Sequence, residues 1–231
     1  MTQQTDTIYA TASRFDIPMP AAVIEADALH AAARELRDSI ADETTPNLGD
    51  VTVKTLTATH KRLVDWHNRD ARLAAADALL KHATAETDRA RFISANQLRK
   101  PLRTLFADRA AAFVKARATL GGVDVHLGVS DPDAWRTLLS SVRGLDALAT
   151  ARAAFSPRGA RANVALGDNF ERISLCLRVP SVETFARRRP SGTGLEFWDA
   201  ALTAGYVIAW QDDAEQVANC EAICRERQAA S

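Results

Sequence analysis

The hydrophobic pattern of the chain changes near residue 121. Before that point, apolar residues recur every three or four positions, which is the period of an amphipathic helix. After it, stretches in which apolar and polar residues alternate are interleaved with helical stretches. Such alternation is typical of a strand with one buried face. The pattern therefore predicts a helical domain at residues 1–120 and an α/β domain at residues 121–231.

Three helices are predicted in the first domain, at residues 20–41, 51–83 and 95–119. The first carries a stripe of apolar residues at helical spacing: Ile24, Ala28, Leu29, Ala32, Leu36 and Ile40. In the second, the seven-residue spacings share no single heptad frame, so we expect ordinary helix packing or an imperfect coiled coil. Short breaks between the helices predict either a compact bundle or a helical hairpin that pairs with a partner.

The third helix has two possible starting points. Residues 94–97 have the form of a capping box, which would start the helix near Ala95. Pro101 would then lie inside the helix and kink it. Alternatively, the helix begins later and Pro101 occupies its first turn.

The second domain opens with a predicted strand at residues 123–129, and Ser130 stands where the N-cap of the next helix belongs. The remaining elements are predicted in the order helix 131–152, strands 164–166 and 173–179, short helix 181–188, helix 195–204, strand 206–210 and helix 212–227. This βαββαβ order with an extra C-terminal helix is the split βαβ arrangement of ferredoxin-like domains. The sequence therefore predicts an α+β fold.

The two central strands of such a sheet would place five polar or small residues on one face: Asp124, His126, Ser174, Cys176 and Arg178. A thiol, an imidazole and a carboxylate can act as nucleophile, base and orienting group. The surrounding sequence has no nucleophile-elbow motif, so we favour a polar interface with a salt bridge between Asp124 and Arg178. The face offers no aromatic side chains on which RNA bases could stack.

A second candidate site is the loop before helix 195–204. It contains Arg187, Arg188, Arg189, Ser191, Gly192, Thr193 and Gly194. Helix N-termini hold anions through backbone N–H groups, and arginine adds bidentate donors. The loop lacks the Lys-Ser/Thr ending of a phosphate-binding P-loop, so the favoured interpretation is a charged surface loop.

Another basic cluster lies earlier in the chain: Arg89, Arg91, Arg99, Lys100 and Arg103. We interpret it as a solvated helix face paired with Glu86 and Asp88. His60 and His67, with Asp70, complete no recognised metal-binding pattern, so no metal or cofactor is expected. The three cysteines also lack metal-binding spacing and are predicted to be reduced packing residues: Cys176, Cys220 and Cys224.

Composition narrows the classes of partner. Lys and Arg number 29 and so do Asp and Glu, so the formal net charge is zero. No strong global field therefore favours nucleic acid or an anionic membrane. The sequence contains no apolar run long enough for a membrane span and no signal-peptide pattern at its N-terminus. These features predict a cytoplasmic protein with no membrane partner.

The sequence carries no zincin, P-loop, hydrolase, EF-hand, kinase or CxxC motif. We therefore expect a non-enzymatic assembly or interaction protein, which binds a protein partner or forms a homo-oligomer through its helical half. Components of phage and other macromolecular assemblies offer an analogy for this layout. Two alternatives stay open. One is an enzyme or small-ligand binder that uses the polar sheet face, and the other is binding of the nucleic-acid backbone through the arginine clusters.

Overall fold

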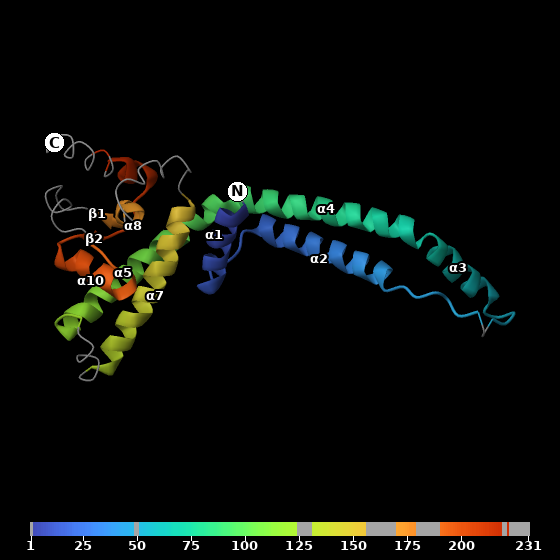
Figure 1. Cartoon of the computed structure of the whole chain (residues 1–231), viewed down its shortest axis with the longest axis horizontal. Coiled ribbons are helices and arrows are strands. Elements are labelled where there is room, and N and C mark those ends of the chain that lie inside the picture. Colours follow the sequence, from blue (N-terminus) through green and yellow to red (C-terminus); the bar gives the residue numbers. More distant parts are fainter. Residues whose placement is uncertain are drawn as a thin grey trace. The chain divides into compact units, whose positions relative to one another are not determined.

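The computed structural model describes residues 2–48, 51–123, 131–155, 170–178, 190–218 and 221. The chain divides into two compact units. The first comprises Met1–Pro18 and Ala95–Ser231, and the second comprises Met19–Ser94. The described residues form a predominantly helical fold (Figure 1).

The first unit contains helices α1 (Thr2–Arg14), α5 (Arg99–Leu120), α7 (Pro132–Ala154), α8 (Phe170–Cys176) and α10 (Gly194–Thr203). It also contains the 3₁₀ helix η1 (Ala95–Leu98), the strands β1 (Leu177–Arg178) and β2 (Val207–Ile208), and a helical stretch at residues 213–218. The second unit contains α2 (Ala21–Ala41), α3 (Leu56–His67) and α4 (Arg69–Ser94).

Helices α5 and α7 form the core of the first unit. Apolar side chains at helical spacing on both helices are fully buried, because the helices pack along each other: Leu102, Phe106 and Phe113 on α5, and Leu138, Leu145 and Leu148 on α7. Trp198 of α10 is also fully buried, and its ring lies 6.3 Å from that of Phe106 in an edge-to-face arrangement. Its indole Nε1 donates to Asp146 Oδ1 of α7 at 2.9 Å, so burial leaves this polar group satisfied.

The ends of α5 and the start of α7 follow from local sequence. Pro101 lies in the first turn of α5, where its missing N–H group costs no helical hydrogen bond. Gly121 has φ +72°, and the N–H groups of Gly121 and Gly122 donate to Ala118 O and Arg117 O. These two bonds form a Schellman motif. The motif requires a residue with positive φ after the helix, and glycine adopts that conformation without steric cost. The N-cap of α7 is Asp131 rather than the expected Ser130, since Asp131 Oδ1 accepts from Ala134 N at 2.9 Å.

The predicted ferredoxin-like domain is wrong. In the part of the chain that the structure describes, the only sheet is the antiparallel pair of β1 and β2, with Leu177 opposite Ile208 and Arg178 opposite Val207. Most of the predicted strand 173–179 is helix α8, and strand 206–210 shrinks to two residues. Ser174 and Cys176 are as buried as the leucines beside them. The alternation of apolar and small polar residues in this stretch therefore does not correspond to one buried and one solvent-exposed face.

Other predicted elements lie close to observed ones. Helices α2, α7 and α10 begin and end within two residues of predicted helices 20–41, 131–152 and 195–204. The predicted helix 51–83 is instead two helices, α3 and α4, which are separated at Asn68. The sequence of residues 1–18 shows no clear hydrophobic period and predicted no helix there, but the structure has helix α1 in this stretch. Most of predicted strands 123–129 and 164–166 and of short helix 181–188 lie outside the described residues.

A buried arginine joins α7 to the stretch that follows β2. Arg152 is fully buried, and its Nε donates to Gln211 O at 2.7 Å. Its Nη2 donates to Asp213 Oδ1 at 3.0 Å and to Gln216 Oε1 at 3.4 Å. Burial lowers the pKa of Arg152, and the neighbouring Asp213 carboxylate acts in the opposite direction. The charge is therefore kept inside the unit by hydrogen bonds and one partly exposed carboxylate.

The second unit is an antiparallel pair of helices, with α2 beside α4 (Figure 1). Buried and half-buried residues recur at alternating intervals of three and four, at positions 23, 26, 30, 33, 37 and 40 on α2, and at 69, 73, 76, 80, 83, 87, 90 and 94 on α4. These are the a and d positions of heptads, so the pair has coiled-coil packing. Its most buried positions include alanines on both helices, which let the backbones approach closely: Ala26, Ala33, Ala76 and Ala83.

Replacing Asp212 by alanine is expected to lower the melting temperature by about 2–4 °C at neutral pH. Asp212 Oδ1 accepts from Glu215 N at 2.9 Å, while Glu215 Oε2 accepts from Asp212 N at 2.8 Å. This reciprocal pair is a capping box at the start of helix 213–218. The backbone N–H of Glu215 holds the pKa of Asp212 below its usual value.

Because the pKa of Asp212 is lowered in the folded chain, the stabilisation by this cap depends on pH. A carboxyl with a depressed folded-state pKa stabilises the fold above its unfolded pKa, which is about 3.9, and loses that contribution as the pH falls through the folded value. The variant Asp212→Asn removes only the charge of this side chain. The difference in melting temperature between wild type and Asp212→Asn should therefore shrink below about pH 4. A difference that grew on acidification would refute this assignment.

Candidate functional site

The candidate site is an apolar surface on the helix pair of the second unit. Four large apolar side chains there are about half exposed: Leu29 (49%), Leu36 (46%), Leu79 (52%) and Ile93 (63%). All four occupy g positions in the heptad register set by the buried seam. In an antiparallel pair the g positions of the two helices lie along the same side, so these residues form one surface, which we name the apolar side.

An ion pair fixes this register. Glu43 and Arg72 lie one heptad beyond Leu36 and before Leu79, and Arg72 donates to both Glu43 carboxylate oxygens, at 2.7 and 2.9 Å. The hydrogen bond to Glu43 raises the pKa of Arg72. Because Glu43 and Arg72 meet across the seam, the equivalent positions of Leu36 and Leu79 are neighbours in the same way. The ion pair of Glu43 and Arg72 also marks the end of the apolar side next to Leu36 and Leu79, and it adds no net charge there.

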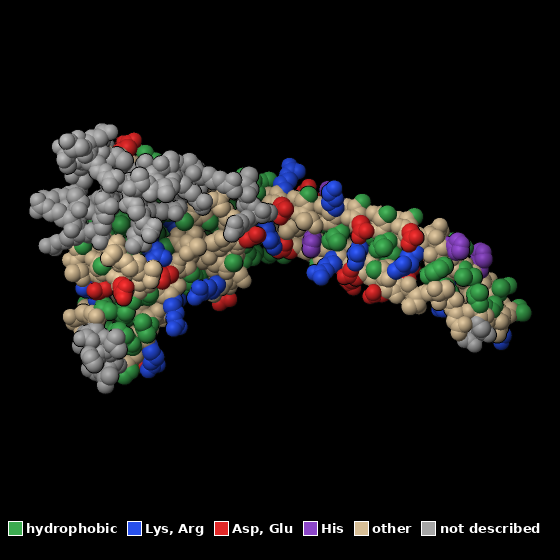
Figure 2. Space-filling view, viewed as in Figure 1, with side chains coloured by type: hydrophobic (Ala, Val, Ile, Leu, Met, Phe, Trp, Pro, Cys, Tyr) green, Lys and Arg blue, Asp and Glu red, His purple; other side chains and the backbone are tan. Residues whose placement is uncertain are grey.

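The opposite side of the helix pair is charged. It carries the e-position residues Asp27, Arg34, Asp77 and Arg91, which we name the charged side. Arg91 Nη2 lies 3.1 Å from Asp27 Oδ1, and Arg37 of the seam donates to Asp77 Oδ1 at 3.2 Å. The carboxylates Asp38 and Asp77 raise the pKa of Arg37. Figure 2 shows hydrophobic side chains beside Lys, Arg, Asp and Glu along this unit. The two sides therefore differ in chemistry.

The end of α2 is held by an arginine of α4. Arg69 Nε donates to Ile40 O at 3.1 Å, and its Nη2 donates to Ala41 O. These carbonyls belong to the last turn of α2 and have no partner within that helix. A cation at this position also complements the negative end of the helix dipole. The contact fixes where α2 ends against α4 and so helps to hold the heptad register.

A further group of exposed apolar residues lies at and before α3. It comprises Leu48, Val51, Val53, Leu56 and Val64, and Val53 is 95% exposed. None of the twelve residues of α3 is buried. In Figure 2 hydrophobic side chains gather over this helix next to histidines. The second unit thus leaves apolar surface uncovered both along the helix pair and at α3.

The residues predicted to share a sheet face are not arranged that way where the structure describes them. Cys176 ends α8 and is fully buried, with no disulfide, while Arg178 lies on β1 with an exposed side chain 3.8 Å from Glu215. Ser174 is buried within α8. Asp124 and His126 lie outside the described residues. A fully buried thiol is inaccessible to a substrate, so Cys176 has the surroundings of a packing residue.

The predicted anion-binding loop is described only in part. Arg187, Arg188 and Arg189 lie outside the described residues, as do Cys220 and Cys224. Thr193 is the N-cap of α10 but makes no side-chain capping bond, and Gly194 is the first residue of the helix. Ser191 and Gly192 precede them, and Gly192 has φ +82°.

Most cations of the cluster at residues 89–103 are paired with carboxylates. Four of its cations each lie within 4 Å of one: Arg89 with Glu86, Arg91 with Asp27, Arg99 with Asp213 and Arg103 with Glu215. Such pairing leaves little unbalanced charge for a phosphate backbone. Among the residues that the structure describes, no group of three or more His, Cys, Asp or Glu side chains is placed to hold a metal ion.

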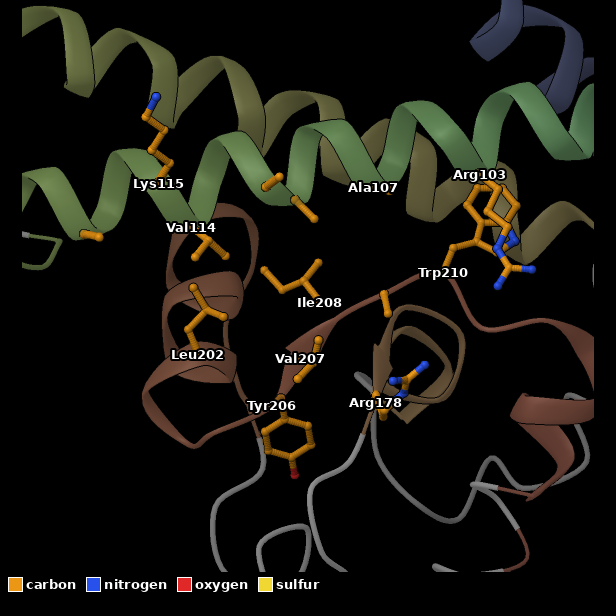
Figure 3. Close-up of a pocket in the computed structure, with 14 residues that line it drawn as sticks. Arg103, Ala107, Val114, Lys115, Arg178, Leu202, Tyr206, Val207, Ile208 and Trp210 are labelled. Atoms are coloured by element: carbon orange, nitrogen blue, oxygen red, sulfur yellow. The ribbon is translucent and has the colours of Figure 1, made fainter.

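The first unit has an apolar groove of about 720 Å³ between α5 and the residues around β2 (Figure 3). Small side chains line its α5 wall: Ala107, Ala110, Ala111, Val114 and Ala118. Val114, Leu202, Val207 and Ile208 lie around a common space in the close-up. Its polar lining residues are Arg103, Lys115, Arg178 and Tyr206, which supply no carboxylate, thiol or imidazole for acid–base chemistry.

No protein family, curated protein or solved structure matches this chain. No helix in the described ranges is both long enough and apolar enough to cross a lipid bilayer.

Proposed function

We propose that the chain is a non-enzymatic assembly protein, in which two copies associate through the apolar side of the second unit. One observation carries the proposal. The apolar stripe that the sequence places on α2 is largely exposed in the single chain, since the seam with α4 uses Val23, Ala26 and Ala33 and takes only Ile40 from that stripe. Exposed leucines that continue onto a second helix are the usual sign of an interaction surface.

A second copy is the partner that this surface fits best. Leu29, Leu36, Leu79 and Ile93 are all uncharged, while Glu86, which occupies the g position between Leu79 and Ile93, lies 3.9 Å from Arg89 of the same helix. The four apolar residues are therefore complementary to those of a second copy in a twofold arrangement. Packing two such helix pairs side by side would produce a four-helix bundle, which is a common way for amphipathic helices to bury a second stripe. An arrangement of this kind leaves the charged side in solvent.

The energy available from burying the apolar side is of the right order for a weak, reversible dimer. Fully burying a leucine or isoleucine contributes about 1.5–3 kcal/mol, so a half-exposed one contributes roughly 1 kcal/mol. Eight such side chains in two copies give roughly 8 kcal/mol before the cost of association. The small alanines of the seam bury little surface within one hairpin, which adds to the benefit of a second layer.

Sedimentation velocity over a dilution series tests the proposal on the wild-type chain. The expected result is a sedimentation coefficient that falls on dilution as dimer converts to monomer. A monomer at every concentration up to about 1 mM would contradict it, since roughly 8 kcal/mol less an association cost of at least about 4 kcal/mol corresponds to a Kd near 1 mM.

A further inference from the structure

A pocket of about 330 Å³ in the first unit collects four arginines from three helical segments. Arg14 ends α1, Arg109 lies on α5, and Arg136 and Arg143 lie seven residues apart on one face of α7. Phe15 and Ser140 also line the pocket. The four cations are separated by up to 129 positions in sequence, since they run from residue 14 to residue 143, and the fold brings them together.

The charge of this pocket is not balanced by the described residues. Arg136 has a carboxylate partner, because its Nη2 lies 2.5 Å from Asp133 Oδ1, and both side chains are strongly exposed. For Arg14, Arg109 and Arg143, no described carboxylate lies within ion-pair distance. This contrasts with the cluster at residues 89–103, where four cations have acidic neighbours. An excess of positive charge in a concave site attracts an anion.

Two of the guanidinium groups are held in place without an acid. The guanidinium carbon of Arg14 lies 5.7 Å from the centre of the Phe15 ring, and that of Arg109 lies 5.8 Å from it. Cation–π contact with one ring orients both groups, although like charges gathered there repel each other. An anion bound between them would relieve that repulsion.

Gly144 shapes the pocket wall. A Cβ atom at this position of α7 would lie 3.2 Å from both Cγ and Cδ of Arg109, which is closer than ordinary packing. The absence of a side chain at Gly144 therefore lets the Arg109 stem lie directly on α7. Glycine in the middle of a helix carries an entropic cost, so this close approach is a structural reason for its presence.

We propose that this pocket binds the phosphate group of a phosphorylated ligand. Guanidinium groups bind phosphate through paired N–H donors, and several arginines around one site match the several oxygens of a phosphate better than the two of a carboxylate. The Ser140 hydroxyl supplies another donor at the pocket wall. A small phosphorylated molecule and a nucleic-acid backbone both present this chemistry, and the pocket volume accommodates either a small ligand or one backbone segment.

The test titrates the full chain with two probes. Sodium tripolyphosphate is followed by calorimetry, and a fluorescein-labelled DNA strand of about 20 nucleotides is followed by anisotropy, both at about 50 mM salt. Saturable binding of at least one probe is expected. Arg143→Gln and Arg109→Gln should each weaken it about tenfold or more, since each removes charge-assisted hydrogen bonds. Arg62→Gln, which removes the same charge from exposed helix α3, should change affinity less than about twofold.

A variant that keeps all four arginines distinguishes the effect of the pocket's geometry on anion affinity from the effect of its charge. Gly144→Ala displaces the Arg109 stem and should weaken binding about threefold or more, while helical circular dichroism stays unchanged. Arg143 is exposed, so its substitution does not disturb core packing. Binding of both probes, weakened by the same variants, assigns a nucleic-acid backbone as the source of phosphate. Binding of tripolyphosphate alone assigns a small phosphorylated ligand.

Two results would overturn the proposal. One is the absence of saturable binding of either probe by the folded wild-type chain. The other is an equal loss of affinity in Arg62→Gln and Arg143→Gln, since that would show attraction by overall charge rather than by this pocket.

Discussion

Replacing both Leu36 and Leu79 by glutamate is expected to weaken self-association of the chain about 100-fold or more. In a twofold dimer the double substitution removes four half-exposed leucines from the interface and places four carboxylates there. The lost apolar burial and the cost of desolvating unpaired charges act in the same direction. Because both residues lie outside the seam between α2 and α4, the helix content of the single chain should be unchanged. Sedimentation velocity and circular dichroism measure the two quantities.

The matched control is Ala31→Glu with Ala74→Glu. Both alanines are exposed at b positions of the same two helices, so the control changes apolar residues to the same charge away from the apolar side. Its dimer affinity should stay within about threefold of wild type, an effect of roughly 0.6 kcal/mol. Equal weakening by the two double variants would indicate nonspecific charge repulsion and would argue against an interface at Leu36 and Leu79.

Arg152→Met is expected to destabilise the first unit by about 3 kcal/mol. Methionine fills much of the volume but donates no hydrogen bond, so Gln211 O and Gln216 Oε1 lose the hydrogen bonds that they accept from Arg152. Contact of the guanidinium with the Trp210 ring, 5.9 Å away, is lost as well. The Asp213 side chain is partly exposed and keeps Arg99 as a partner at 2.8 Å, which limits the penalty. Chemical denaturation monitored by tryptophan fluorescence gives the free energy of unfolding.

Arg178→Met is the control for this effect. Arg178 is exposed and its ion pair with Glu215 is long, at 3.8 Å, so the substitution should cost less than about 0.5 kcal/mol. A free energy of unfolding that is the same for the two variants would mean that the buried network around Arg152 contributes nothing to stability.

The sequence predicted long amphipathic helices better than short elements. Helix α7 has enough turns for the spacing of Leu138, Leu145 and Leu148 to be unambiguous, and Asp131 with Pro132 marks its start. The stretch at 173–179 is too short for that test. Its alternation of leucine or isoleucine with serine and cysteine suits a half-buried strand, but small polar side chains are readily buried, and helix α8 buries them all.

The seam between α2 and α4 could not be predicted from large apolar residues, because many of its positions are occupied by alanine or by polar residues. Its a and d positions include Ala26, Ala33, Arg37, Thr87 and Ser94. The leucines at 29 and 36 draw attention to a different side of α2. A search for alanine at seven-residue spacing would have found Ala26 and Ala33 on α2 and Ala76 and Ala83 on α4.

The arginine pocket was missed for a different reason. Arg14, Arg109 and Arg143 are isolated from one another in sequence, and only their packing around Phe15 and Gly144 brings them together. Runs of basic residues were more conspicuous, but four cations of the cluster at 89–103 are paired with acids. The one sequence signal was the pair Arg136 and Arg143, seven residues apart on a single helix.

Site-specific photo-crosslinking tests the proposed assembly most directly. A benzophenone amino acid is placed at Leu36 on the apolar side, or at Arg34 on the charged side, in otherwise wild-type chains that carry two tags of different size. The account predicts covalent dimers containing both tags from position 36, with crosslinks mapped by mass spectrometry to α2 or α4 of the second copy, and little product from position 34. No dimer from position 36, or equal yields from the two positions, would contradict it.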